Sequence, residues 1–328
     1  MTKEEKILRL KELDYISDNQ VVDFQKYQSK KIFSLNTELL FLMYLSVLLF
    51  TSGVGVLIYK NIDTIGHSII LALIFIVTII CFYFSFKKAK GFAKEQVAFE
   101  NPVYDYLVLT GSSLACVFVG YLQYQYQVLG NNYQWVSLVS ALICFAVAYF
   151  FDQRTVLSMA ITALTAFVGI TLTPKTILEN EVYNNAPLSY YGLSLAVLLL
   201  LWTYFSEQQQ LKKHFSLVFY TFAQHLSGIC IIAGLTNDYW GVFILFSLGI
   251  NYYFYQLSHR IQEISLFVFS LIYAYIGLNI VIGRVLSYID MGEFFSLLAM
   301  MLPVYVVVSI ILFIKAIRNF KKNKYASV

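Results

Sequence analysis

Long apolar segments recur along the whole chain and constrain its fold more than any other feature. A helix needs about 20 mostly apolar residues to cross a bilayer, and ten segments of this sequence approach that length. They are 39–59, 68–86, 104–123, 134–151, 155–172, 188–205, 215–235, 240–257, 264–283 and 294–314. Only 13% of the residues are charged, against about 25% in an average soluble domain. We therefore predict an all-α, polytopic transmembrane bundle of about ten spans.

The distribution of Lys and Arg predicts how the spans are oriented. Of the 23 basic residues, 20 lie in the N-terminal segment, in alternate loops and in the C-terminal tail. The other loops hold only Lys60, Lys175 and Arg284. Basic loops stay on the cytoplasmic side of a membrane. An even number of spans, with both termini in the cytoplasm, is the arrangement that this pattern predicts.

The predicted organisation has five parts. They are a cytoplasmic amphipathic helical segment (1–38), spans one to five (39–172), an outer loop (173–187), spans six to ten (188–314) and a basic cytoplasmic tail (315–328). The N-terminal segment carries two apolar stripes at helical spacing, one around Leu10 and one around Phe24. These two helices either dock on the inner loops or recruit a protein partner. Their evenly mixed charges argue against binding to nucleic acid.

The tail is expected to meet the lipid surface. Lys315, Arg318, Lys321, Lys322 and Lys324 follow the last span closely. Clusters of basic residues at the cytoplasmic end of a span attract anionic headgroups. We therefore expect the bilayer, and its anionic headgroups at the tail, to be partners of this chain.

The first half of the chain carries a family resemblance. The stretches LKELDYISDNQVVDFQKY, GVGVLIYKNID (Gly53–Asp63), YDYLVLTGSSL, GYLQYQYQVLG and AYFFDQRTVLSMAITALTAFVGITLTP lie between residues 5 and 174. Together they resemble a family of bacterial integral membrane proteins labelled domain of unknown function 2157. The resemblance implies many helices in a bacterial inner membrane. It supplies no activity and no functional residues, and spans six to ten resemble no family that we can name.

Polar residues within the spans are the first candidates for a site, because lipid makes them costly. His225 lies near the middle of the seventh span and shares one helical face with Thr221, Gln224 and Gly228. This face either forms interhelical hydrogen bonds that fix packing or lines a path for a solute. The full set of candidate solute-lining residues is Thr221, Gln224, His225, Asn251, Tyr275 and Asn279.

Two further features are candidates outside that face. Gln123, Gln125, Tyr126 and Trp135 gather amides and aromatic rings after the third span. This outer lip suits a sugar or a lipid headgroup, and it equally suits an interfacial aromatic belt. Pro303 lies within the tenth span and predicts a kink, which is either a gate or a fixed bend.

Catalytic chemistry finds no support in the sequence. It contains no GxxxxGK[ST], GxSxG or HExxH motif, and its four cysteines lie in apolar stretches without a CxxC spacing. We expect no enzyme activity, no cofactor and no metal. The best functional hypothesis is a passive or weakly coupled carrier or handler of a small neutral or lipid-like solute. The alternative is a non-catalytic membrane scaffold or assembly protein.

The predicted orientation is tested with reporter fusions. A reporter fused after the C-terminal tail should report the cytoplasm, and one fused beside Glu181, in the loop predicted to be outside, should report the external side. The reason is the excess of basic residues on one set of loops. A C-terminus on the external side would refute the ten-span arrangement.

Overall fold

The computed structural model describes residues 17, 36–130, 132–172, 186–288 and 294–326, and these residues contain helices and no strand. The chain divides into two compact units, Met1–Val56 and Leu57–Val328. Helix α3 (Asn36–Ile65) crosses the boundary between them. The predicted amphipathic segment before residue 36 lies outside the described residues, Ser17 excepted, and so does the predicted outer loop from 173 to 185.

The second unit consists of helices joined by short connections. They are α4 (His67–Lys88), α5 (Val103–Tyr126), α6 (Gln134–Phe151), α7 (Arg154–Leu172), α8 (Ala186–Gln208), the 3-10 helix η2 (Lys213–Phe215), α9 (Ser216–Leu235), α10 (Trp240–Ile261), α11 (Ile264–Ser287) and α12 (Phe294–Ala326). With α3, the described α-helices correspond one to one to the ten predicted spans. The all-α prediction is therefore confirmed.

Eight of the described helices are long and apolar enough to cross a membrane: α3, α4, α5, α6, α8, α9, α11 and α12. Helix α7 supplies a shorter apolar stretch, Arg154–Gly169. Helix α10 is more polar in its second half, where Asn251 and Gln256 lie among three tyrosines. The chain is thus a multi-pass membrane protein, and the side of the membrane on which each end lies stays a prediction.

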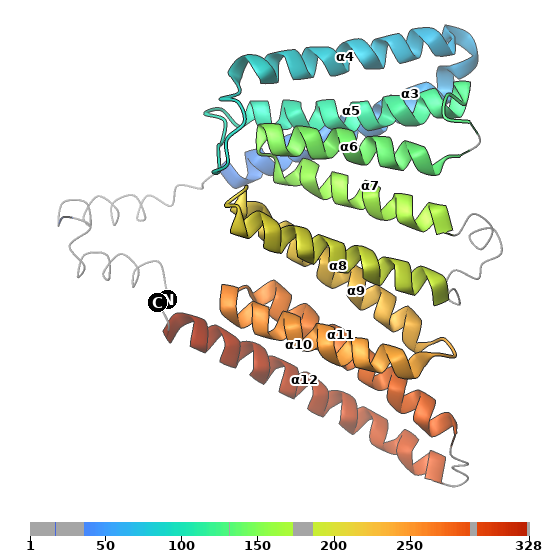
Figure 1. Cartoon of the computed structure of the whole chain (residues 1–328), viewed down its shortest axis with the longest axis vertical. Helices are drawn as coiled ribbons and strands as arrows, with labels where there is room; N and C mark the ends of the chain where they lie inside the picture. The colour runs from blue at the N-terminus through green and yellow to red at the C-terminus, as the bar shows by residue number, and fades with distance from the viewer. Residues whose placement is uncertain (1–16, 18–35, 131, 173–185, 289–293, 327–328) are drawn as a thin grey trace. The chain divides into compact units, whose positions relative to one another are not determined.

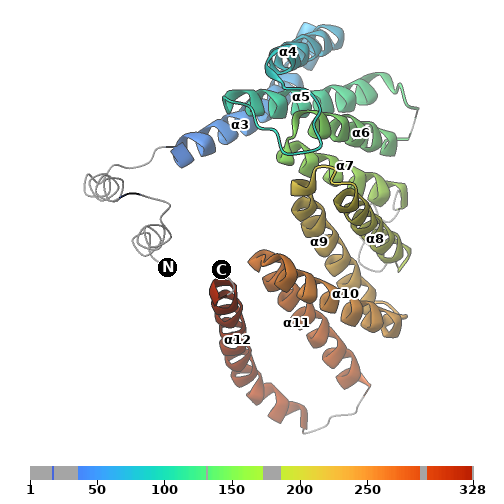
Figure 2. The ribbon, with the colours of Figure 1, turned by 60° about the vertical axis from the view of Figure 1, so that its left-hand side comes forward.

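Consecutive helices of the second unit run side by side (Figure 1) and pack as the pairs α4–α5, α6–α7, α8–α9 and α10–α11. Helix α9 also contacts both α10 and α11, and Figure 2 shows it beside α8 with α10 and α11 next to it. Within the pair α5–α6 the thiols of Cys116 and Cys144 lie 3.5 Å apart, and all four cysteines are free.

Small residues on α9 let its neighbours come close. A methyl group added at Gly228 would lie 2.6 Å from the ring of Tyr273 on α11, and one added at Gly234 would overlap the ring of Phe243 on α10. Phe243 is completely buried. Close helix approach at small residues is the usual means of association in membranes. Helix α9 is therefore the element against which α8, α10 and α11 pack.

The close contact at Gly228 gives a stability prediction. Gly228→Ala should destabilise the purified protein by about 1–3 kcal/mol, because the added methyl group displaces the Tyr273 ring in a filled space. Gly249→Ala, on an open face of α10 where nothing lies within 4 Å, should leave stability unchanged or raise it. Denaturant unfolding in detergent micelles measures both. Equal behaviour of the two variants would contradict the packing argument.

Candidate functional site

Three charged or ionisable side chains meet at one end of the bundle, and we call Asp152, Lys212 and His214 the Asp152 cluster. The Lys212 Nζ atom lies 3.0 Å from Asp152 Oδ2, and the two side chains are 1% and 2% exposed. The Nε2 atom of His214 bonds Asp152 Oδ1. A buried carboxylate is stable only when it is paired and hydrogen-bonded, and this one is both.

The backbone places these groups by taking left-handed conformations at two of them. Asp152 ends α6 with a φ of 61°, and its amide donates to the Ala148 carbonyl. Lys212 precedes η2 with a φ of 51°. Aspartate tolerates this conformation better than most residues, whereas lysine has no such preference. The two sharp turns direct both side chains back toward the bundle instead of toward water.

The cluster also fastens the segment between α4 and α5. The Val97 amide donates to Asp152 Oδ2 at 2.6 Å. The Lys212 amide donates to the Lys94 carbonyl at 2.8 Å, and its Nζ reaches the Glu95 carbonyl at 3.4 Å. The Lys212 ammonium also lies 5.7 Å from the centre of the Phe92 ring. One buried pair thus holds three connections that are distant in sequence.

The same turn is tied to the start of α5. The Gln153 side-chain amide donates to the Asp105 carbonyl at 3.1 Å and to Asp105 Oδ1 at 3.2 Å. Asp105 lies in the first turn of α5, at the edge of the span, and the Gln153 side chain contacts it there. Only three polar residues separate the apolar segments of α6 and α7, which predicts a tight turn between them. The structure confirms that turn.

The bonding of Asp152 limits the chemistry open to it. A carboxylate has about four acceptor positions, and three of those of Asp152 are already occupied, by the Val97 amide, the Lys212 ammonium and the His214 ring. A general base needs a free lone pair within reach of a substrate proton. The arrangement is therefore suited to holding segments together. Among the described residues no three His, Cys, Asp or Glu side chains gather as a metal site.

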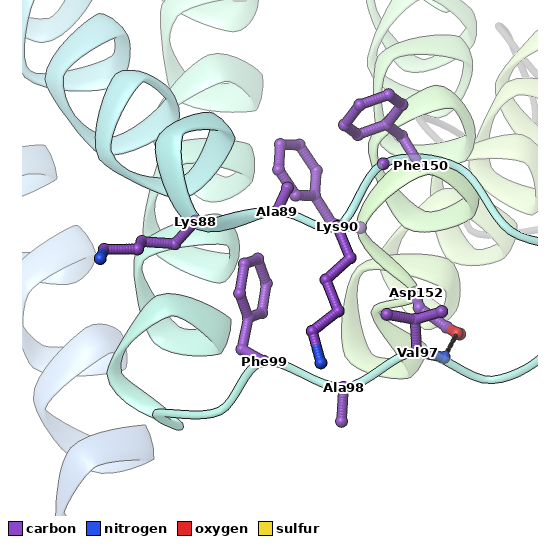
Figure 3. A pocket seen from close by; sticks show the side chains of 10 residues that line it. Lys88, Ala89, Lys90, Val97, Ala98, Phe99, Phe150 and Asp152 are labelled. Carbon is purple, nitrogen blue, oxygen red and sulfur yellow. Dashed lines mark hydrogen bonds between the residues drawn. The ribbon is translucent and has the colours of Figure 1, made fainter.

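A crevice opens beside the cluster. It has an empty volume of about 270 Å³, counted with its open side, and is lined by residues from 88–91, 97–99 and 150–152. Figure 3 shows the Lys90 side chain extending toward Ala98, while Lys88 points away from the crevice. The rings of Phe86 and Phe151 pack 4.7 Å apart next to it. The crevice is thus lined by aromatic rings and small apolar residues together with Lys88, Lys90 and Asp152.

The structure pairs the predicted face of α9 with α11. Gln224 Nε2 donates to the Leu266 carbonyl at 2.8 Å and to Ser270 Oγ at 2.9 Å. His225 Nδ1 lies 2.9 Å from the Tyr273 hydroxyl. Thr221, the third member of the face, donates to the Leu217 carbonyl within its own helix. The Gln224 and His225 contacts are interhelical bonds of the kind that one of the two sequence interpretations anticipated.

The other predicted solute-lining residues lie elsewhere. Asn251 donates to the Ser247 carbonyl of α10 at 2.9 Å. Asn279 donates to the Tyr275 carbonyl at 2.7 Å and accepts from the Tyr305 hydroxyl of α12 at 3.0 Å. Residues two apart on a helix do not share a face, so Tyr275 faces α12 and Tyr273 faces α9. The structure therefore does not gather the predicted set at one place: Gln224 and His225 contact one face of α11, Tyr275 and Asn279 lie on its face toward α12, and Asn251 bonds within α10.

The predicted outer lip is tied to its own turn. Gln123 is buried, donates to the Gly130 carbonyl at 2.5 Å and accepts from the Leu129 amide at 2.8 Å. The Tyr126 hydroxyl lies 2.7 Å from Ser68 Oγ at the start of α4. Trp135 packs against Phe167 with ring centres 5.9 Å apart, and Gln125 is half-buried. Ligand binding at the outer lip, and its alternative role in an interfacial aromatic belt, stay predictions.

Helix α12 contains both Pro303 and most of the predicted tail. The helix continues across Pro303 to Ala326, so the basic residues up to Lys324 lie on its last turns. Phe320 is buried against Phe267 of α11, with ring centres 4.5 Å apart. A gate at Pro303 and headgroup binding at the tail stay predictions.

Comparison with known proteins bears on the first half of the chain. Residues 9–157 match the family model described as Predicted membrane protein (DUF2157). The resemblance predicted from the sequence is thereby confirmed for the N-terminal half. Neither the curated proteins nor the solved structures contain a match to this chain.

The Asp152 cluster has members on both sides of the C-terminal limit of the region that matches DUF2157. Asp152 lies inside that region, whereas Lys212 and His214 lie beyond its end. The cluster therefore joins the DUF2157 region to the start of α9. Sequence reasoning missed it, because these residues are separated by about 60 positions and look like ordinary loop charges. The available signal was an aspartate in a three-residue turn between two apolar segments.

The Asp152 cluster gives a prediction with a matched control. Asp152→Asn should cost about 3–5 kcal/mol of stability, because it leaves the Lys212 ammonium buried without its counter-charge. Glu100→Gln removes a carboxylate from the same end of the bundle. Its pair with Lys90 spans 3.9 Å with side chains 90% and 60% exposed, so the cost should be at most about 1 kcal/mol.

Denaturant unfolding in micelles measures both variants. The double variant Asp152→Asn with Lys212→Met should recover part of the loss, because it removes the uncompensated charge as well. A loss no larger than that of Glu100→Gln would refute the role of the buried pair.

Proposed function

We propose that this protein is a non-catalytic membrane scaffold and not a carrier. The observation that carries the proposal is the pairing of Gln224 and His225 with Ser270 and Tyr273 across the α9–α11 contact. A binding site directs a few polar groups at its ligand. The donors of these residues are instead used between helices, as in ordinary membrane packing.

The Asp152 cluster supports the same proposal. Its carboxylate has three donors around it and ties the DUF2157 region to α9 through a buried ion pair. Alternating access requires one part of a carrier to move against another. A charged pair that is costly to break opposes such movement at this end of the bundle. A scaffold gains from the same rigidity, with the N-terminal segment as the predicted site for its partner.

One observation favours the carrier as a second candidate. The Oε1 atom of Gln224 is buried and accepts no hydrogen bond among the described residues. An unpaired buried carbonyl is costly, and a hydroxyl or amide of a neutral solute would satisfy it. The two proposals differ in one measurable property, which is the access of water to position 225.

The proposal predicts a water-inaccessible His225. In a variant whose four native cysteines are replaced by alanine, His225→Cys should resist a small water-soluble thiol reagent in the native protein and react fully after denaturation. Lys94→Cys, on an exposed loop position, should react in both states and serves as the positive control. In the native sequence, His225→Leu should cost less than about 2 kcal/mol, since interhelical polar contacts in membranes are weak.

Each result decides between the two proposals. Protection of the thiol introduced at position 225, together with the small cost of His225→Leu, supports the scaffold. Labelling of that thiol in the native protein, from either side of the membrane, would overturn the scaffold and favour the carrier, with Gln224 as the solute acceptor.

A further inference from the structure

A second pocket adjoins the crevice beside the Asp152 cluster, and we call it the lysine groove. It has an empty volume of about 860 Å³, counted with its open side, and lies where α4 ends and α5 begins. Its lining residues are Lys87, Lys88, Ala89, Lys90, Phe99, Glu100, Asn101 and Tyr104. It shares Lys88, Ala89, Lys90 and Phe99 with the crevice drawn in Figure 3.

The charge of the lysine groove is unbalanced. Three lysines line it against one carboxylate, that of Glu100. Among the described residues Glu100 forms an ion pair with Lys90 alone, over 3.9 Å and with both side chains exposed, a geometry that contributes little. Within the part of the chain that the structure describes, no ion pair involves Lys87 or Lys88. The nearby Asp152 is already bound to Lys212 and His214. The groove therefore attracts an anion.

The position of the groove indicates that its ligand also has an apolar part. Helix α4 ends at Lys88 as a candidate membrane span. The residues just before that end, Tyr83, Phe84 and Phe86, are exposed aromatic side chains. The apolar outer surface of α4 thus leads directly to the three lysines. A ligand that matches both parts has an anionic head and apolar chains.

We propose that the lysine groove binds the phosphate of an anionic phospholipid whose acyl chains lie along the outer surface of α4. Lys87, Lys88 and Lys90 all line the groove and carry the positive charge that pairs with the phosphate. The Asn101 amide and the Tyr104 hydroxyl supply neutral donors at the rim for headgroup oxygens. This site is separate from the basic tail and does not depend on the scaffold proposal.

Lipid retention tests the proposal. The full chain is purified in detergent, mixed with phosphatidylglycerol and phosphatidylcholine of equal chain length, and the lipid bound per protein is counted by native mass spectrometry. The wild type should retain phosphatidylglycerol in preference. Lys87→Gln, Lys88→Gln and Lys90→Gln together should lower that retention by about tenfold or more, since each basic group near a headgroup contributes to the attraction.

The matched control removes three positive charges from basic residues that do not line the groove. Lys94→Gln, Arg154→Gln and Lys213→Gln together change three exposed basic residues and should leave retention unchanged. Glu100→Gln, which leaves every lysine in place, should raise retention of phosphatidylglycerol. This second variant keeps the proposal testable if the triple lysine variant does not fold.

The outcomes that overturn the proposal are distinct. Equal loss in the groove variant and its control would indicate general electrostatic attraction. Equal retention of the two lipids would exclude recognition of the anionic head. Displacement of the lipid by millimolar inorganic phosphate would assign the groove to a water-soluble phosphate. Lower retention in Glu100→Gln would exclude the charge argument.

Discussion

The buried contact of Asp152 with Lys212 and His214 is the interaction on which the arrangement of this end of the bundle depends. Three connections meet there: the segment between α4 and α5, the turn between α6 and α7, and the stretch between α8 and α9. A charge pair removed from water is costly unless both partners stay in place. Displacing any one of the three connections would therefore break contacts of this buried pair and weaken the hold on the other two.

The C-terminal half relies on a different combination of forces. Gly228 and Gly234 let the rings of Tyr273 and Phe243 approach α9, and Tyr273 then reaches His225. Lipid offers helices no hydrophobic reason to associate, so close packing and hydrogen bonds must do so. The polar residues of α9 and its glycines thus act on the same contact. This explains why a polar face in the middle of a span need not indicate a solute path.

The ten described helices were predictable from the sequence, because length and hydrophobicity define apolar spans. Their ends were less predictable, since α12 continues to Ala326 through most of the predicted tail. The face formed by Thr221, Gln224 and His225 was also predictable, since helical spacing places them together. Their partners were not, because Ser270 and Tyr273 look like ordinary span residues. Nor was the buried state of Lys212, which carries the same sequence signal as an exposed topogenic lysine. Long-range pairing leaves no periodic trace in a single sequence.

The basic residues at one end of the bundle are therefore not equivalent, although all contribute to one orientation signal. Lys212 forms a buried ion pair with Asp152. Lys87 and Lys88 stand exposed at the end of α4 with no carboxylate paired to them among the described residues. A buried charge whose needs are met internally stabilises the fold, whereas an exposed group of like charges is relieved by an external anion. The same sequence signal thus divides into a structural part and an exposed part, and the division follows from which lysine the fold pairs with Asp152.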